Sequence, residues 1–186
     1  YELRPLIAAI ISSPENMKRI DAIRQNNLRR TGMLAGTPDD DQIAFVYLSY
    51  TVHGNEAAGA ESSMAVLYDL LKGGEPYDTW LKNTVVIIDP TLNPDGYNRY
   101  SQWSNSVSSS PNNPNPVARE HSEPWPGGRS NHYYFDLNRD WAWQSQQESR
   151  DRIALYHQWM PQVHADFHEM GAESPYYFAP AAKPYH

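Results

Sequence analysis

Histidine and carboxylate side chains stand in this sequence at positions that suit a metal site. His53 and Glu56 lie three residues apart in "TVHGNEAAGAE", directly after the apolar run "IAFVYLSY". Imidazole nitrogen and carboxylate oxygen are both zinc ligands, and a catalytic zinc needs a third protein ligand and one open position. His168 is the natural candidate for that third ligand, because it stands at the end of another apolar run, "VHADFHE". A His-x-x-Glu pair is weak evidence by itself, and a polar turn that opens a helix is the competing interpretation of the first segment.

Apolar runs and helix-type patterns alternate along the chain and indicate the elements that would position these side chains. Ser13 and Pro14 are typical of a helix start, and Gly73-Gly74 is typical of a helix end. The pattern predicts an α/β fold with a mixed, mostly parallel sheet flanked by helices on both faces. We expect strands at 5–11, 43–50, 84–90 and 163–169, and helices from Ser13 to about Leu28, from Glu56 to about Leu71 and over 148–160. The second helix is expected to present Ala60, Met64, Leu67 and Leu71 as its apolar face.

Four polar segments stand at or near the ends of the expected strands. In open α/β sheets, binding and catalytic groups gather at the carboxyl edge of the strands, so these segments are expected to share one site. They are His53–Glu56, Asn93–Gly96, Arg129–Asp140 and His168.

Residues 101–132 are rich in Ser, Asn, Pro and Gly and have no hydrophobic period. A disordered linker is one interpretation of this stretch. Because it contains Trp103 and Trp125 and lies inside a single domain, we favour a long irregular loop that forms the rim or wall of a site.

Composition narrows the classes of function. Fifteen Lys and Arg against twenty-two Asp and Glu give a net charge of −7, which disfavours a general nucleic-acid binder. The chain has no cysteine, so any zinc must be bound by His and carboxylate side chains. No apolar run is long enough to predict a membrane span.

The 186 residues suit one domain. The sequence begins as though a strand were entered directly, and it ends without an obvious closing element. We therefore expect residues 1–186 to form a single domain that is incomplete at both ends.

Four segments together resemble the zinc metallocarboxypeptidases of the carboxypeptidase A/B type. They are "HGNEAAG", "NPDGYNRY", "GGRSNHYYFDLNRDW" and "DFHEMG", in the order in which that family has them. Four motifs in one order are far more specific than any one of them.

The resemblance implies one zinc ion per chain, held by His53, Glu56 and His168. It implies that Asp136 orients His53, and that Arg129 stabilises the oxyanion of the substrate. Arg119 is the rival for the oxyanion role, although its spacing fits worse.

Substrate recognition is assigned by the same resemblance to Asn138 and Arg139, which would bind a terminal carboxylate. Asp140 departs from the family pattern, where asparagine is more familiar, and would place a negative charge beside Arg139. Asn93 to Gly96 are expected to shape a turn near the site without a catalytic role.

The implied function is zinc-dependent removal of C-terminal residues from peptides that carry a free carboxylate. The family's general-base glutamate follows the third ligand at a distance, so we expect it to be absent from these 186 residues. Glu169 is a poor substitute because a strand would point it away from His168, and nothing favours Glu173; Tyr176 and Tyr177 come too early for the family's substrate-capping tyrosine. Two alternatives stay open: a zinc amidase, deacylase or cell-wall peptide hydrolase of the same superfamily, or a non-catalytic zinc-dependent module that binds peptide ends. Only the resemblance favours an extracellular or periplasmic location, and the residues themselves do not indicate a compartment.

Overall fold

A computed structural model describes residues 4–171 and 174 of the chain, and in this part four strands form one sheet. Their order across the sheet is β1-β3-β2-β4. The strands are β1 (Ala9–Ile11), β2 (Ala44–Tyr50), β3 (Thr84–Asp89) and β4 (Val163–Phe167). The helices are α1 (Pro14–Met17), α2 (Ile20–Arg30), α3 (Ala58–Lys72), α4 (Tyr77–Lys82), α5 (Pro94–Val107) and α6 (Gln147–Trp159), with short 3₁₀ turns η1 (Arg119–His121) and η2 (Leu137–Arg139).

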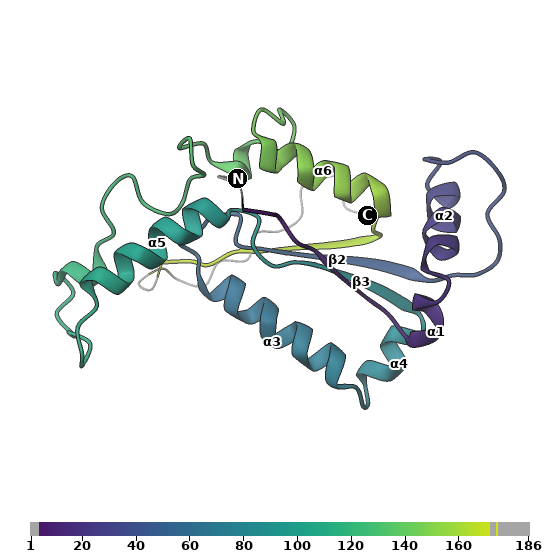
Figure 1. Ribbon diagram of the computed structural model, residues 1–186, viewed down its shortest axis with the longest axis horizontal. Helices are drawn as coiled ribbons and strands as arrows, with labels where there is room; N and C mark the ends of the chain where they lie inside the picture. The colour runs from purple at the N-terminus through teal and green to yellow at the C-terminus, as the bar shows by residue number, and fades with distance from the viewer. Residues whose placement is uncertain (1–3, 172–173, 175–186) are drawn as a thin grey trace.

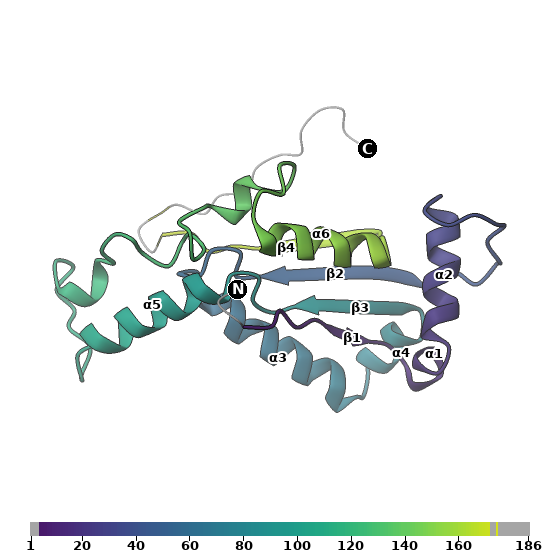
Figure 2. The same ribbon diagram turned by 45° about the horizontal axis from the view of Figure 1, so that its top comes forward.

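The sheet is mixed and mostly parallel, which confirms the predicted fold class. β2 pairs in parallel with β3 on one side and with β4 on the other, whereas β1 runs antiparallel to β3. Ser49 of β2 pairs with Asp89 of β3 and with Asp166 of β4, so the three strands end at the same level. In Figure 2 the arrowheads of β2 and β3 point toward the end of the molecule from which α5 projects.

Helices cover both faces of the sheet, and Figure 1 shows α6 and α3 on opposite sides of the strands. A hydrophobic core lies on each face of the sheet, and alternate residues of β3 point into one core or the other, as expected for a strand. Val86 and Ile88 pack with Leu70 of α3 and Leu81 of α4. On the other face, the core contains Ile23, Phe45, Tyr47, Val85, Ile87 and Trp159.

The N-terminal helical segment begins where the sequence predicts. The side chain of Ser13 accepts a hydrogen bond from the backbone N–H of Asn16, and Pro14 occupies the first turn. The segment is interrupted after Met17, so two helices, α1 and α2, replace the single helix that we expected.

Helix α3 is rotated relative to the prediction. Met64 and Leu71 are 58% and 65% exposed, whereas Ala60, Ser63 and Leu70 are the buried residues. The predicted apolar face of Ala60, Met64, Leu67 and Leu71 is therefore wrong in two of its four members. Gly73 ends the helix with φ of 75°, as its sequence indicates.

The predicted irregular loop at 101–132 is wrong at its start, because α5 continues through Val107. The turn predicted at Asn93–Gly96 is the beginning of this helix: the Asn93 side chain accepts a hydrogen bond from the N–H of Gly96. The high content of Ser and Asn conceals the helix, because these residues have low helix propensity. From Ser108 onward the segment has no regular structure apart from η1.

Among the described residues, no helix combines the length and apolar character needed to cross a membrane.

Candidate metal centre

The carboxyl ends of β2 and β4 bring the two predicted ligand segments together. Tyr50 pairs with Phe167 in the last register position of the two strands, and their rings stack with centroids 4.4 Å apart. His53 follows β2 and His168 follows β4, so the two imidazoles meet at the sheet edge with ring centroids 5.0 Å apart. Between β2 and His53 the chain turns through Thr51, whose φ of 55° is unusual for a β-branched residue.

Glu56 lies between the two histidines. Its Oε1 is 2.8 Å from Nδ1 of His53, and its Oε2 is 3.1 Å from Nδ1 of His168. One ligand atom from each of the three residues lies within 4.8 Å of the others. This donor set fits zinc, because two ligands about 2 Å from a tetrahedral zinc ion stand about 3.3 Å apart. The structure thus brings together the three residues that the sequence singles out as ligands.

Asp136 holds the outer nitrogen of the first histidine. Nε2 of His53 is 3.0 Å from Oδ1 of Asp136, and His53 is only 2% exposed. A carboxylate at Nε2 holds a proton on that nitrogen, so that a neutral His53 would have its lone pair on Nδ1, the nitrogen that faces Glu56. Burial alone would raise the pKa of Asp136, but the charge and hydrogen bond of His53 and the charge of Arg129 outweigh it and lower that pKa.

A second carboxylate, which the sequence analysis did not single out, holds the other histidine. Oδ2 of Asp166 is 3.1 Å from Nε2 of His168, and its Oδ1 accepts a hydrogen bond of 2.9 Å from the hydroxyl of Ser49. Burial would raise the pKa of Asp166, but hydrogen bonds from His168 and Ser49 outweigh it and lower that pKa. The signal was present in the sequence, since Asp166 and His168 stand two apart near the end of a strand and so face the same side.

The two carboxylates beside His168 also favour the protonated form of its ring. Hydrogen bonds with Asp166 and Glu56 raise the pKa of His168 to about 9. Burial would raise the pKa of Glu56, but hydrogen bonds from His168, His53 and the backbone of Glu169 lower it to about 2. Protons and a metal ion therefore compete for the same atoms.

Arg129 lies beside the cluster. Its Nε and Nη2 atoms are 3.2 Å and 3.1 Å from Oδ2 of Asp136, and its Nη1 is 3.4 Å from Nδ1 of His53. The side chain is half exposed, so the fixed positive charge stands at the edge of the candidate site. Its rival Arg119 lies in η1, within the irregular segment.

Asn138 and Arg139 lie in η2, directly after Asp136. The N–H of Asn138 donates to Oδ1 of Asp136, and this bond ties η2 to the carboxylate that contacts His53. Arg139 is exposed, and its guanidinium donates to the carbonyl of Asn138 at 3.1 Å. The backbone bond of Asn138 therefore places both residues close to the cluster of His53, Glu56 and His168, but neither residue belongs to it.

Asp140 does not act on Arg139 as the sequence suggests. Its carboxylate turns away to accept hydrogen bonds from the backbone N–H groups of Ser145 and Gln146 and from the hydroxyl of Ser145. Burial would raise the pKa of Asp140, but the interactions with Ser149, Gln146 and Ser145 lower it to about 2. Asp140 therefore fixes the loop that leads into α6, which corrects the expectation of a charge directed at the substrate-binding pair.

Three glycines bring the loops of the site into backbone contact. A Cβ atom on Gly54 would lie 2.1 Å from the backbone of Gly96 and Tyr97, and one on Gly96 would lie 2.4 Å from the carbonyl oxygen of Gly128. Such distances exclude any side chain. The glycines therefore allow the loop that carries His53 and the loop that carries Arg129 to pack on the start of α5.

The irregular segment after α5 also contacts the site loop. Glu123 accepts hydrogen bonds from the side chain of Asn55 and from the N–H of Gly128, so it joins the residue beside Glu56 to the residue beside Arg129. These contacts place Glu123 of the irregular segment against the loops that carry Glu56 and Arg129.

Glu169 has a structural partner. β4 ends at Phe167, so Glu169 is not in the strand; its carboxylate accepts a hydrogen bond of 2.7 Å from the N–H of Ala58 at the start of α3. Its backbone N–H donates to Oε2 of Glu56. Glu173, Tyr176 and Tyr177, which the sequence analysis weighed for other roles, lie outside the described residues.

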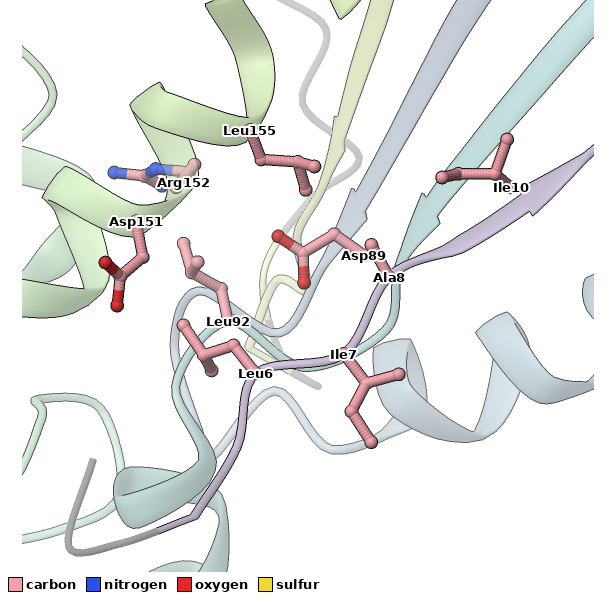
Figure 3. A pocket seen from close by; sticks show the side chains of 9 residues that line it. All are labelled: Leu6, Ile7, Ala8, Ile10, Asp89, Leu92, Asp151, Arg152 and Leu155. Carbon is pink, nitrogen blue, oxygen red and sulfur yellow. The ribbon is translucent and has the colours of Figure 1, made fainter. Parts of the chain in front are cut away.

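Two cavities have different surroundings. One of about 140 Å³ opens beside Glu56 and His168 and is also lined by Tyr50 and Phe167. The other, of about 280 Å³, is mostly apolar and lies between α6 and the segment that leads into β1; Figure 3 shows Leu6, Ile7, Leu92 and Leu155 around it, with Asp89 at its wall. None of the proposed zinc ligands lines this second cavity.

Comparison with known proteins identifies the family. Residues 1–166 match the zinc carboxypeptidase family, and the chain therefore belongs to it. The match includes all the candidate residues except His168, which follows its end, so the place of His168 beside Glu56 is independent support for the third ligand.

Curated relatives agree with this assignment. The chain is similar to Probable carboxypeptidase 2 of Arthroderma benhamiae and to Carboxypeptidase 2 of Trichophyton tonsurans, with 28% identity over 127 residues in each case. The matched segment covers 68% of this chain and 19% of the length of each relative.

Proposed function

We propose that this chain carries the zinc-binding residues of the catalytic centre of a metallocarboxypeptidase, which removes C-terminal residues from peptides by attack of water. The observation that carries the proposal is the convergence of His53, Glu56 and His168 at the end of β2 and β4, with their ligand atoms within 4.8 Å of one another. Membership of the zinc carboxypeptidase family supports it. One zinc ion per chain, bound by these three residues, would supply the Lewis acidity that polarises the scissile carbonyl and the attacking water.

In this proposal Asp136 and Arg129 act on either side of His53. Asp136 accepts a hydrogen bond from Nε2–H of His53, so that Nδ1 is the nitrogen that would present its lone pair to the metal. Arg129 donates hydrogen bonds to the substrate oxygen as negative charge develops on it. Asp136 also holds the guanidinium of Arg129 from behind, which reduces the reorganisation needed when that charge appears.

Asn138 and Arg139 are proposed to bind the terminal carboxylate of the peptide. A guanidinium offers a planar pair of donors to a carboxylate, and an amide adds a further hydrogen bond. The exposure of Arg139, and the turning of Asp140 toward α6, leave this guanidinium without the competing acidic neighbour that the sequence suggested.

Binding of matched peptides to the zinc-loaded chain tests the proposal. A short peptide with a free C-terminal carboxylate should bind at least about tenfold more tightly than its C-terminal amide, since a charged bidentate contact is lost in the amide. Arg139→Ala should remove this difference, whereas Arg30→Ala, which changes an exposed arginine of α2, should preserve it. Equal binding of acid and amide would contradict a carboxypeptidase and favour an amidase of the same superfamily.

A further inference from the structure

One face of β4 carries two polar residues, and a third continues the row after the strand ends. His164 and Asp166 are two apart in β4, and His168 follows at the same spacing after its end. The neighbouring residue of β2 on this face is Ser49, which pairs with Asp166 in the register of the two strands. The hydroxyl of Ser49 lies 2.9 Å from Nε2 of His164 and 2.9 Å from Oδ1 of Asp166.

The hydrogen bonds of this row have a definite direction. An ionised carboxylate only accepts, so Asp166 requires the single proton of the Ser49 hydroxyl at Oδ1 and an N–H from His168 at Oδ2. Because the Ser49 proton is used in this way, Nε2 of His164 must donate to the Ser49 oxygen. The chain of donors therefore runs from His164 through Ser49 to Asp166, which receives a second proton donor from His168.

The direction of these bonds sets the ring of His168. With Nε2–H held by Asp166, the proton that a metal ion would displace is the one on Nδ1, the nitrogen that lies 3.1 Å from Oε2 of Glu56. We propose that Asp166, itself fixed by Ser49, is the positioning residue that presents Nδ1 of His168 to the metal. This inference rests on the proposed zinc site.

Each of the two proposed ligand histidines therefore has a carboxylate at its Nε2 atom, and the two carboxylates come from different elements. Asp136 reaches Nε2 of His53 from η2, and Asp166 reaches Nε2 of His168 from within the sheet. Asp166 is held by the pairing of β4 with β2 and by the hydroxyl of Ser49, whereas Asp136 is the N-cap residue of η2 and accepts the N–H of Asn138. The sheet itself thus sets the orientation of the third ligand.

A purely structural role for Asp166 is the competing explanation. The buried guanidinium of Arg152 lies close enough to interact electrostatically with Asp166 and Asp89, so Asp166 also offsets a buried positive charge. That role predicts a loss of stability in an Asp166 variant. It does not predict which nitrogen of His168 binds a metal.

The first experiment therefore uses the unmodified chain. With ¹⁵N-labelled histidine and an NMR-active isotope of Cd²⁺ in place of zinc, spin coupling shows which ring nitrogen of His168 binds the metal. We expect coupling to Nδ1, with a slowly exchanging proton on Nε2. Coupling to Nε2 would overturn the proposal without any substitution.

The second experiment measures zinc affinity by competition with a chromogenic chelator. Asp166→Asn should weaken zinc binding by about 10- to 100-fold, the usual effect of removing the carboxylate behind a ligand histidine. Ser49→Ala keeps the carboxylate and should weaken binding by about two- to tenfold. Asp21→Asn removes an acidic side chain that is 80% exposed on α2 and should leave the affinity unchanged.

Failure of this inference is distinguishable from failure of the zinc site. If the unmodified chain binds no stoichiometric zinc, the proposed function fails. If it binds zinc through His168 and the folded Asp166→Asn and Ser49→Ala variants both bind within about twofold of it, the positioning role is wrong and the zinc site stands. Thermal unfolding and circular dichroism of each variant show whether it is folded.

Discussion

The Nδ1 atom of His168 lies 3.1 Å from Oε2 of Glu56, although 112 positions separate the two residues in the sequence. The contact follows from the parallel pairing of β2 with β4, which ends at Tyr50 and Phe167. Because both strands stop at the same level, the first residues after each of them meet at one edge of the sheet. The candidate metal centre is therefore a consequence of strand register, and it forms only when the sheet has formed.

Replacement of His168 tests the ligand set directly. The unmodified chain should bind about one zinc ion, and His168→Ala should weaken binding by more than about 100-fold, since removal of a ligand exceeds the effect of removing a partner behind it. Stoichiometry measured by metal analysis after dialysis gives the result. His157→Ala, an exposed histidine on α6, is the matched control and should bind zinc normally. Unchanged zinc content in His168→Ala would exclude His168 from the site.

The glycine contacts predict that Gly54 tolerates no side chain. In Gly54→Ala the new Cβ would meet the backbone of Gly96 and Tyr97 at 2.1 Å, and neither can yield as a flexible side chain would. We expect a loss of about 3 kcal/mol or more in the free energy of unfolding, at the upper end of overpacking effects. Urea denaturation measures it.

A matched alanine substitution shows whether the effect is steric. Ser62→Ala removes a hydroxyl at an exposed position of α3 and should change the free energy of unfolding by less than about 0.5 kcal/mol. Near-native stability of Gly54→Ala would mean that the two site loops and the start of α5 do not pack through their glycines.

Much of the sheet was predictable because its strands can be recognised from short segments of the sequence. β2 and β3 are short apolar runs rich in β-branched and aromatic residues, and the structure has both within one residue of the expected bounds. The order of the strands was not predictable, because it depends on which runs pair across long crossovers. Without that order, the contact between Ser49 and Asp166 could not be predicted, although the spacing of Asp166 and His168 already placed their side chains on the same side of the expected strand.

The helices show a different limit. α3 has more apolar residues than one face can bury, so Met64 and Leu71 fit a helical stripe in the sequence and yet lie exposed in the structure. In α5 the residues themselves are misleading, because Ser and Asn have low helix propensity. The helix nevertheless forms, and the Asn93 side chain caps its first turn. Hydrophobic periodicity identifies a helix when the residues of the helix are typical helix formers and its apolar residues lie on the buried face. Where these conditions fail, tertiary packing determines which residues are helical and which are buried.

Glu169 is expected to stabilise α3 and to have no part in proton transfer. Ala57, the N-cap residue of α3, has no side-chain acceptor for the backbone N–H groups of the first turn. The carboxylate of Glu169 accepts a hydrogen bond from the N–H of Ala58 instead. Glu169→Ala should therefore lower the free energy of unfolding by about 1 kcal/mol. Thermal or urea unfolding measures the change.

The isosteric variant Glu169→Gln separates this structural role from catalysis. It keeps an oxygen acceptor for Ala58 and should lose less stability than Glu169→Ala, with zinc binding unchanged. Robust turnover that disappears in a folded, zinc-loaded Glu169→Gln variant would identify Glu169 as the base and refute the structural assignment.

Asp140 predicts an acid-dependent contribution to stability. Its pKa is about 2 in the folded chain, against an ordinary value of 3.8, because the interactions with Ser149, Gln146 and Ser145 outweigh its burial. As pH falls, the unfolded chain therefore takes up a proton at this carboxyl before the folded chain does. The stabilisation is complete above about pH 5, and it is lost progressively as the pH falls toward about 2. The contribution at neutral pH is at most about 2 kcal/mol, because water screens part of these interactions.

Asp140→Asn removes the charge and keeps one acceptor oxygen at nearly the same position. The variant should be less stable than the unmodified chain near neutral pH, and this difference should shrink as pH falls from about 5 toward about 2. Urea denaturation at a series of pH values measures it. Asp21→Asn, at an exposed position of α2, should give a small difference that is nearly the same at every pH. If the Asp140→Asn difference were constant across this range, the Asp140 carboxylate would not hold the start of α6 as a charged acceptor, and its bonds to Ser145 and Gln146 would have to contribute through geometry alone.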